Sequence, residues 1–358
     1  MNKFLGIVLI LILAGAAYLV FWPVPIEPVA WDAPEAPGLE GPYAVNDRLA
    51  GVEWLAKGVA SGPEDVAVDD QGRIYGAYAD GKIRRLQPDG SGAAVFADTG
   101  GRPLGMDWAP DGSLVVADAV RGLLAVRPDG TVRTLATAAA GVPFGFVDDV
   151  AVAEDGTVYF SDASHKFGMH HVMADIIEHG GNGRLLKYEP MADEVTVLLQ
   201  GLQFANGVAV GPGERYVLVN ETGAYRVTRY WLTGDAAGGS DTFAANLPGF
   251  PDNISYDGED TFWLAIYAPR NPSLDYMSDK PFLRKVAYRL PEQLQPGTKK
   301  HAIVLGLSTG GDVLYNLQDA SADAYAPITA VEEVGDILYF GSLTAPAMAR
   351  MPVPDGTR

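Results

Sequence analysis

Short apolar runs separated by polar turns recur along most of this chain, and the two runs of each copy keep the same spacing. In the first copy, the run Val66 to Val68 is followed by a turn ending at Gly72 and by a second run from Ile74. Apolar runs broken by Gly- and Asp-containing turns are typical of antiparallel strand pairs. Residues eleven positions apart mark the two runs of each copy: Glu64 with Tyr75, Leu104 with Val115, Asp148 with Tyr159, Asn206 with Val217, Asp252 with Trp263, and Ile328 with Tyr339.

The six copies begin 40, 44, 58, 46 and 76 residues apart, a loose period that fits one propeller blade per copy. We therefore predict an all-β fold, a six-bladed β-propeller. Further segments that end in Pro-Asp-Gly turns, such as Lys82 to Leu86, are predicted to be the outer strands.

Aligning the copies reveals a column of polar residues at the start of the first run. The innermost strands of all blades start at one end of the central channel, so this column predicts a ring of side chains around the axis. Carboxylates forced together repel one another unless a cation neutralises them. Five oxygen donors plus water or substrate suit Ca²⁺ better than Mg²⁺, although each residue capping its own turn is the alternative. The predicted metal ligands are Glu64, Asp148, Asn206, Asp252 and Asn253.

The first 42 residues differ in composition from the repeats. Residues Phe4 to Trp22 form an uncharged apolar run long enough to span a bilayer, with Lys3 before it. We predict a single N-terminal transmembrane helix (residues 1–22) that leaves the rest of the chain in the periplasm or outside the cell, and a cleaved signal peptide is the rival interpretation. Residues 23–42 contain six prolines and are predicted to be a semi-rigid linker, followed by the propeller at 43–358.

Composition and charge narrow the chemistry further. The chain has no cysteine, which excludes disulfides, thiolate metal sites and cysteine nucleophiles. Its formal net charge of −19 over 358 residues argues against nucleic-acid binding, because an acidic surface repels phosphate.

Two stretches, 164–182 and 268–300, interrupt the repeat rhythm, and Asp279 to Leu294 is expected to be partly helical. Long insertions on a scaffold commonly form functional loops. We predict a substrate rim there, with a plain surface loop as the alternative. Zinc is disfavoured because the histidine spacing fits no zinc pattern. The candidate rim residues are His165, His170, His171 and Arg270.

Several segments also resemble the superfamily of calcium-dependent six-bladed propellers that includes strictosidine-synthase-like proteins, gluconolactonases and paraoxonases. Within it the chain is similar to the branch of adipocyte plasma membrane-associated proteins, which also carry an N-terminal anchor. The segments keep the family order over most of the chain after about residue 55. They are FSDAS (160–164), NGRLLKY (182–188), GLQFANGV (201–208), YWLTG (230–234), GFPDNI (249–254), PFLRK (281–285) and LYFGSL (338–343).

The resemblance implies a catalytic calcium on the same five ligands, and a second, structural calcium at Asp65 and Asp149. Asp148 stands where paraoxonases have an asparagine, so this ring is one negative charge richer. Leu104 and Asp118 replace the paraoxonase histidine pair, and Ala324 to Pro327 lacks the strictosidine synthase glutamate.

These observations predict a calcium-dependent hydrolase of small-molecule esters or lactones. Asp252 is the first candidate for the base that activates water, and Glu64 is the second. A non-catalytic calcium-binding scaffold and a strictosidine-synthase-like lyase are the alternatives. A serine hydrolase is disfavoured because neither Ser161 nor Ser342 lies in a Gly-x-Ser-x-Gly motif.

Overall fold

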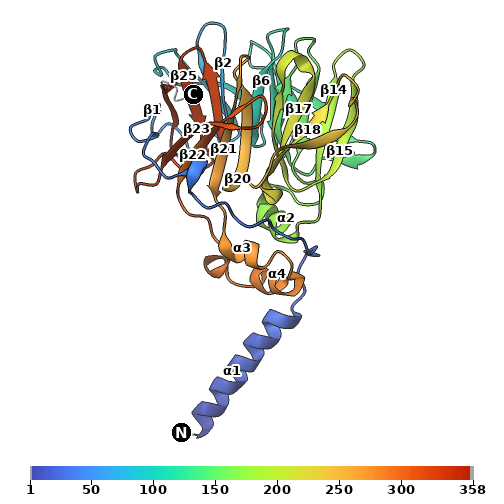
Figure 1. Cartoon of the computed structure of the whole chain (residues 1–358), viewed down its shortest axis with the longest axis vertical. Coiled ribbons are helices and arrows are strands. Elements are labelled where there is room, and N and C mark those ends of the chain that lie inside the picture. The colour runs from blue at the N-terminus through green and yellow to red at the C-terminus, as the bar shows by residue number, and fades with distance from the viewer. Residues whose placement is uncertain (1, 355–358) are drawn as a thin grey trace.

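Six four-stranded antiparallel sheets surround a central axis in the computed structural model, which describes residues 2–354 (Figure 1). The predicted six-bladed propeller is confirmed, because both runs of every copy become the first two strands of one sheet. The first three sheets are β2 (Val66–Val68), β3 (Ile74–Ala77), β4 (Lys82–Leu86) and β5 (Ala94–Asp98); β6 (Pro103–Trp108), β7 (Leu114–Asp118), β8 (Gly122–Val126) and β9 (Val132–Ala136); β12 (Val147–Val152), β13 (Val158–Asp162), β14 (Gly183–Glu189) and β15 (Glu194–Leu202).

The other three sheets follow the same order from the axis outward, and a small hairpin precedes the third. The fourth and fifth sheets are β16 (Ala205–Val210), β17 (Tyr216–Glu221), β18 (Arg226–Trp231) and β19 (Ser240–Ala244); β20 (Gly249–Tyr256), β21 (Thr261–Pro269), β22 (Ala302–Ser308) and β23 (Val313–Asp319). The sixth sheet is β24 (Ala330–Val334), β25 (Ile337–Gly341), β26 (Met348–Pro352) and β1 (Glu53–Leu55), and the hairpin is β10 (Ala138–Ala139) with β11 (Val142–Pro143).

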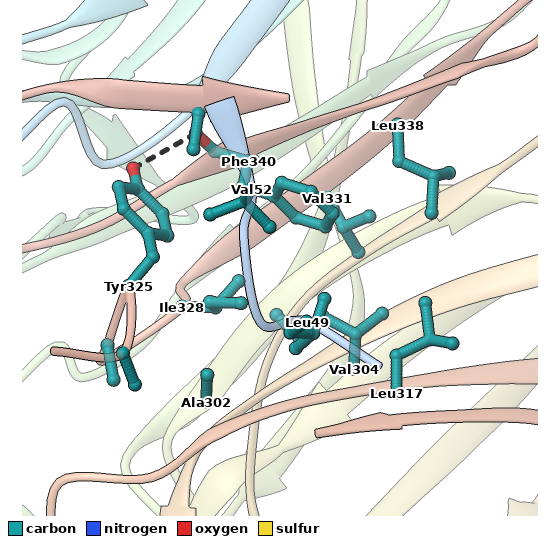
Figure 2. Close-up of a cluster of buried hydrophobic side chains, with 14 of the residues drawn as sticks. Leu49, Val52, Ala302, Val304, Leu317, Tyr325, Ile328, Val331, Leu338 and Phe340 are labelled. Carbon is teal, nitrogen blue, oxygen red and sulfur yellow. Dashed lines mark hydrogen bonds between the residues drawn. The ribbon is translucent and has the colours of Figure 1, made fainter. Parts of the chain in front are cut away.

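The two ends of the propeller chain meet in the sixth sheet. Its outermost strand β1 pairs antiparallel with β26, so an N-terminal strand completes a sheet begun by the last strands. Just before β1, Leu49 and Val52 pack into the apolar core between the fifth and sixth sheets (Figure 2). The Tyr325 hydroxyl donates to the carbonyl of Phe340 at 3.1 Å in the same core. Pairing the last sheet in this way removes the open edge that a linear row of blades would leave.

Both predicted insertions lie at one end of the propeller and contain most of the helices in the described chain (Figure 1). The insertion 164–182 contains η2 (Met169–His171) and α2 (Val172–Glu178), and the insertion 268–300 contains α3 (Pro272–Tyr276), α4 (Pro281–Tyr288) and η5 (Glu292–Leu294). We name these two insertions together the cap. Short 3₁₀ turns lie elsewhere at η1 (Gly41–Tyr43), η3 (Pro212–Glu214) and η4 (Thr222–Ala224).

The N-terminal helix α1 (Asn2–Phe21) projects from the cap end of the molecule (Figure 1). Its apolar stretch Lys3–Phe21 has a mean hydropathy of 2.8, and none of it is buried against the propeller. By length and composition it is a candidate membrane span or signal sequence.

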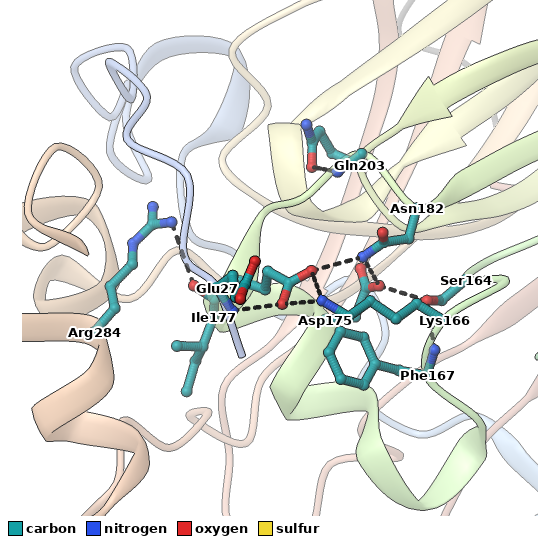
Figure 3. A network of polar contacts seen from close by, with 11 residues as sticks. Glu27, Ser164, Lys166, Phe167, Asp175, Ile177, Asn182, Gln203 and Arg284 are labelled. Carbon is teal, nitrogen blue, oxygen red and sulfur yellow. Dashed lines mark hydrogen bonds and ion pairs between the residues drawn. The ribbon is translucent and has the colours of Figure 1, made fainter. Parts of the chain in front are cut away.

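Residues 23–40, which we name the strap, run across the cap instead of standing free of it. Ile26 is fully buried beside Phe167 and Ile177. The backbone N–H of Glu27 donates to the Glu178 carboxylate at 2.7 Å (Figure 3). Trp31 stacks on His179 with ring centroids 4.2 Å apart. The strap therefore connects α1 to the cap through packed side chains and hydrogen bonds.

Candidate functional site

The five predicted metal ligands lie together at the cap end of the central channel. Four of them lie on inner strands β12, β16 and β20, and Glu64 lies two residues before β2. All five side chains are buried, with exposed fractions between 1% for Glu64 and 7% for Asp252. We name this set, Glu64, Asp148, Asn206, Asp252 and Asn253, the ring.

A β-bulge at the same point of successive inner strands aims the ring residues. In the third sheet Val147 pairs with Asp162 and Val150 with Phe160, so three residue steps oppose two. The second, fourth and fifth sheets have equivalent register shifts. A bulge inserts an extra residue and redirects side chains, which is why bulges are common next to active sites. The repeat thus places the ring residues at the mouth of the channel.

The amide groups of the ring hold its carboxylates in fixed orientations. Asn206 Nδ2 donates to Asp252 Oδ1 at 2.8 Å, and Asn253 Nδ2 donates to Glu64 Oε1 at 3.0 Å. Both amide nitrogens are therefore used, and the amide oxygens are left over. Nine buried side-chain polar atoms lack a hydrogen-bond partner among the described residues, and four are ring oxygens: Glu64 Oε2, Asp148 Oδ2, Asn206 Oδ1 and Asn253 Oδ1.

Whether a cation fits the ring depends on these four unpartnered oxygens. A buried acceptor without a partner costs about 1–3 kcal/mol, so four in one ring is a large penalty unless something binds them. Carboxylate and amide oxygens are the donors that Ca²⁺ uses in proteins. No three acidic or histidine side chains of the described residues form a metal cluster on their own, so the centre depends on its two amides. With the amide oxygens of Asn206 and Asn253 included, the set of oxygen donors fits a calcium ion.

Burial and mutual repulsion both oppose ionisation of the ring carboxyls. Burial raises the pKa of Glu64 to about 8, and the nearby charge of Asp252 adds to the shift. Burial also raises the pKa of Asp252 to about 7, which the hydrogen bond from Asn206 partly offsets. The pKa of Asp148 lies well above its usual range through burial and then through the charges of Glu64 and Asp252. A bound divalent cation would reverse these shifts, because it favours the ionised forms.

Arg102 is a buried cation whose charge acts on the ring. Its Nη1 donates to the carbonyls of Gly62 and Ala77, at 3.0 and 3.3 Å, and it lowers the pKa of both Glu64 and Asp148. One guanidinium offsets only part of the charge of three carboxylates. The remaining excess of negative charge favours a cation at the ring.

A cavity of about 830 Å³ lies above the ring and is enclosed partly by the cap. Glu64, Asp148, Asn206 and Asp252 contribute to its floor, and most of its wall is apolar. Three of the wall residues, Phe146, Phe204 and Phe250, each stand two positions before a ring residue. Alternation along a strand places residues two apart on the same face. Sequence reasoning missed these aromatics, although the column two positions before the ring contains the signal.

The structure brings part of the predicted rim to this cavity. His170 and His171 are exposed and line it. His165 is outside the lining set, and its Nδ1 lies 2.6 Å from the carbonyl of Asn182. Arg270 is also outside it, since its side chain is buried and bonds to Asp275, Asn246 and the carbonyl of Pro34. Arg270 therefore joins the cap to the strap rather than facing the cavity.

Asp65 and Asp149, the predicted ligands of a second calcium, use their carboxylates differently from the ring. Asp65 Oδ2 accepts the N–H of Met106 at 2.7 Å, and Asp149 Oδ2 accepts that of Val208 at 2.8 Å. Each contact joins the inner strands of neighbouring sheets. Neither residue has an unpartnered buried oxygen, so their calcium site stays a prediction.

Two positions that depart from the family pattern, Asp118 and the segment Ala324 to Pro327, have structural roles. Asp118 accepts the backbone N–H groups of Arg102, Val120 and Arg121 at 2.8–3.0 Å, and it is fully buried. Tyr325, in the segment that lacks the expected glutamate, donates to backbone carbonyls inside the core. Neither segment offers a free acid or base to the cavity.

Comparisons with known proteins agree with this architecture. The family model described as strictosidine synthase matches residues 148–235, and the model of the strictosidine synthase-like N-terminal region matches residues 41–86. The chain is 34% identical over 349 residues to the adipocyte plasma membrane-associated protein of Rattus norvegicus, covering 91% of this chain and 93% of the relative. It is 36% identical over 310 residues to strictosidine synthase-like protein 6 of Arabidopsis thaliana, covering 84% and 82%.

Among solved structures, a gluconolactonase from Xanthomonas campestris superimposes with a TM-score of 0.63 at 17% sequence identity, covering 92% of this chain and 99% of that one. At this identity the likeness concerns the fold alone. The sequence relatives match most of both chains and show the family: this chain belongs to the strictosidine-synthase-like family of six-bladed β-propellers.

Proposed function

We propose that this protein is a calcium-dependent hydrolase of esters or lactones, with its centre at the floor of the cavity. The observation that carries the proposal is the set of four unpartnered ring oxygens beneath a largely apolar cavity. Such a floor would hold a cation where the carbonyl of an apolar substrate could reach it. The fold shared with a protein described as a gluconolactonase supports the same class of reaction.

Glu64, Asp148, Asn206 and Asn253 would hold the ion through their unpartnered oxygens. A bound Ca²⁺ supplies Lewis acidity that polarises an ester carbonyl and stabilises the oxyanion. The amide hydrogen bonds of Asn206 and Asn253 keep the ring carboxylates oriented without needing metal. This preorganisation is the contribution of the chain itself.

Asp252 is the residue we assign as the general base, with Glu64 as the second candidate. Asp252 lines the cavity, and Asn206 engages its Oδ1. Its other carboxylate oxygen would accept a proton from water while the water oxygen bonds to the acyl carbon. The same proton then passes to the alcohol oxygen as the acyl–oxygen bond breaks, leaving acid and alcohol. In a lactone these two products remain one hydroxy acid.

The apolar wall defines the substrate class in outline. Phe146 and Phe204 meet edge to face with centroids 5.7 Å apart, and Phe250 and Tyr267 complete an aromatic surface near Asp252. We therefore expect aryl or long acyl groups to bind better than small polar ones. The anchor α1 would hold this hydrolase on a membrane with the propeller facing the periplasm or exterior. Relatives named for the plasma membrane support that placement.

Calcium removal and restoration tests the proposal. The full-length protein in detergent is treated with a chelator and assayed on an arylester and lactone panel, and Ca²⁺ is then titrated back. We expect hydrolysis to vanish and return with calcium. Hydrolysis that persists without calcium refutes the metal mechanism. Calcium-dependent thermal stabilisation with no turnover on any substrate would favour a non-catalytic binding propeller.

A further inference from the structure

The end of α1 is bound to the cap through one buried arginine. Arg289, the residue that follows α4, donates from Nε to the carbonyl of Trp22 at 2.6 Å and from Nη1 to that of Leu19 at 2.9 Å. A cation at the last carbonyls of a helix is favourable, because those groups are unpaired and carry the negative end of the dipole. The C-terminal end of α4 therefore lies within hydrogen-bonding distance of the point where the apolar span ends.

That contact fixes the depth of the cap relative to any bilayer that α1 occupies. The apolar stretch ends at Phe21, and the aromatic pair Tyr18 and Trp22 has the composition of an interfacial belt. Because α4 contacts this last turn, it would lie at the boundary between headgroups and hydrocarbon of a bilayer that α1 spans. Figure 1 shows α3 and α4 between α1 and the propeller.

The cap surface has the side chains that such a boundary requires. Tyr276, Phe282 and Leu294 are 66%, 56% and 67% exposed, one each from α3, α4 and η5. An apolar groove of about 370 Å³ lies between α3 and α4, and Met277 and Leu283 are among the residues that line it. Exposed apolar groups gathered on neighbouring helices are unusual on a water-facing surface and mark an interaction site.

Charge distinguishes this insertion from the rest of the protein. Residues 268–300 contain seven Lys or Arg and three Asp or Glu, whereas the whole chain has a net charge of −19. Three of the seven cations, Arg270, Arg284 and Arg289, are buried, so the basic groups at the surface are Lys280, Lys285, Lys299 and Lys300. An amphipathic helical surface that carries lysines is suited to the headgroup region of a phospholipid bilayer. A soluble acidic partner would match the charge but not the contact with the end of α1.

The cavity lined by the ring opens on the side of the propeller where the cap lies. Tyr288, Glu292 and Gln295 line it from α4 and the segment that follows, and His171 and Ile176 line it from the η2–α2 segment. Its mouth is thus bordered by the helix that contacts α1. A molecule entering from the interface would pass the residues that both segments contribute to the cavity wall before reaching the ring.

We propose that the α3–α4 insertion is embedded in the lipid interface, and that the cavity takes amphipathic esters or lactones directly from the bilayer. The placement stands on the contacts of α1 and the exposed cap residues. The substrate class rests in addition on the proposed hydrolase function. The occupant of this surface is a phospholipid bilayer, the one in which α1 is inserted.

The lack of native cysteine makes the depth of the cap directly measurable. Phe282→Cys and Leu294→Cys in the full chain are labelled with an environment-sensitive fluorophore after reconstitution into phosphatidylcholine vesicles, with and without phosphatidylglycerol. Met191→Cys is the control, since Met191 is fully exposed in the β14–β15 turn, at the far end from the cap. We expect lipid-borne quenchers to act on the two cap labels and aqueous iodide on the control. Equal quenching of all three by iodide overturns the proposed placement.

The substrate class is tested by Phe282→Glu, because Phe282 does not line the cavity. This change should lower hydrolysis of a long-chain ester embedded in vesicles by about tenfold, the effect expected from losing one aromatic group that is buried in the bilayer. Hydrolysis of a short, water-soluble arylester should stay unchanged, and Met191→Glu should affect neither. Equal effects on both substrates overturn lipid-borne entry. No hydrolysis of any ester refutes the proposed function and, with it, the substrate class, whereas the quenching result for the cap still stands.

Discussion

The ring and the cap–strap contact are both rich in buried polar groups, but they satisfy those groups in opposite ways. In the ring, four buried oxygens have no partner within the described chain. In the cap, Glu178 accepts hydrogen bonds from Lys166, Asn182 and the backbone of Glu27 (Figure 3). None of the unpartnered buried side-chain atoms of the described chain belongs to either insertion.

This difference separates a binding site from a structural clamp. A polar network that satisfies all its members is complete without a ligand and adds rigidity, whereas a partly satisfied one carries a standing penalty. The ring should therefore respond to calcium and the cap should not. Four experiments sharpen or break this distinction.

The largest expected effect is on catalysis at the ring. Asp252→Ala should lower the turnover of arylesters by roughly 100-fold or more, because it removes the proposed base. Glu64→Gln should weaken calcium binding, since it removes one charged donor. Both are measured by steady-state kinetics and calcium titration, beside Asp235→Asn, which changes an exposed acid far from the ring. Activity of Asp252→Ala within twofold of the parent would exclude Asp252 as the base.

The next effect concerns pH and calcium. The raised pKa values of Glu64, to about 8, and Asp252, to about 7, mean that the folded metal-free protein binds more protons than the unfolded chain between pH 4.5 and 8. Its free energy of unfolding should therefore fall as pH rises through this window. Calcium, which favours the ionised forms, should stabilise most at the upper end.

Thermal unfolding at pH 5 and pH 8, with calcium and with chelator, measures this effect. The matched control is the double variant Glu64→Gln and Asp252→Asn, in which the pH dependence of the metal-free protein should shrink. A metal-free protein that becomes more stable between pH 5 and pH 8 would contradict the assignment of these two carboxyls as the source.

A smaller effect, confined to the cap, is expected for Arg284. Its guanidinium donates to the carbonyls of Met277, Val29 and Ile177 at 3.0–3.3 Å (Figure 3 shows the contact with Ile177). Arg284→Met should cost about 2–3 kcal/mol of local stability, because it leaves buried carbonyls unpaired. Hydrogen exchange and limited proteolysis of the strap should increase, while calcium affinity stays unchanged.

Lys285→Met, a change in the next residue of α4, is the control and should leave the strap protected. Altered calcium affinity in Arg284→Met alone would show that the cap and the ring are coupled, which would contradict the expectation that calcium acts on the ring and not on the cap.

The smallest effect is a pH response of the strap. Burial, together with the charges of Arg284 and Arg226, lowers the pKa of His179 to about 3, so the unfolded chain binds more protons below pH 6.5. The stack of His179 on Trp31 should therefore lose stability as pH falls from 6.5 toward 3. Hydrogen exchange of residues 26–31 at pH 7 and pH 5 measures the response. His179→Asn should remove the pH dependence; a dependence that survives unchanged in this variant rules His179 out as its origin.

The parts of the molecule that repeat could be predicted from the sequence. Six copies of one strand pair specify the propeller, and one column of the copies contains Glu64, Asp148, Asn206 and Asp252, which the fold brings together. The physical reason is that closure brings equivalent positions to one axis, whatever their distance along the chain. The six four-stranded sheets confirm the predicted blades.

The contacts of the cap and the strap could not be predicted, because each of them occurs once in the chain. Nothing in the proline-rich composition of residues 23–40 indicates that Ile26 is buried or that Trp31 meets His179. Arg270 is a similar case: as a charged residue in a long insertion it suggested a substrate contact, but it bonds to the strap, to Asn246 and to Asp275 of its own insertion. Only tertiary structure shows which long-range contacts such residues make.

The pairing of β1 with β26 has a consequence for biogenesis. β1 (Glu53–Leu55) is synthesised roughly 290 residues before its partner β26 (Met348–Pro352). During elongation the propeller must persist as an open crescent, because the sixth sheet still lacks the strand with which β1 pairs. A nonsense mutation just before β26 would leave the crescent unclosed and would expose the edges of β1 and β25.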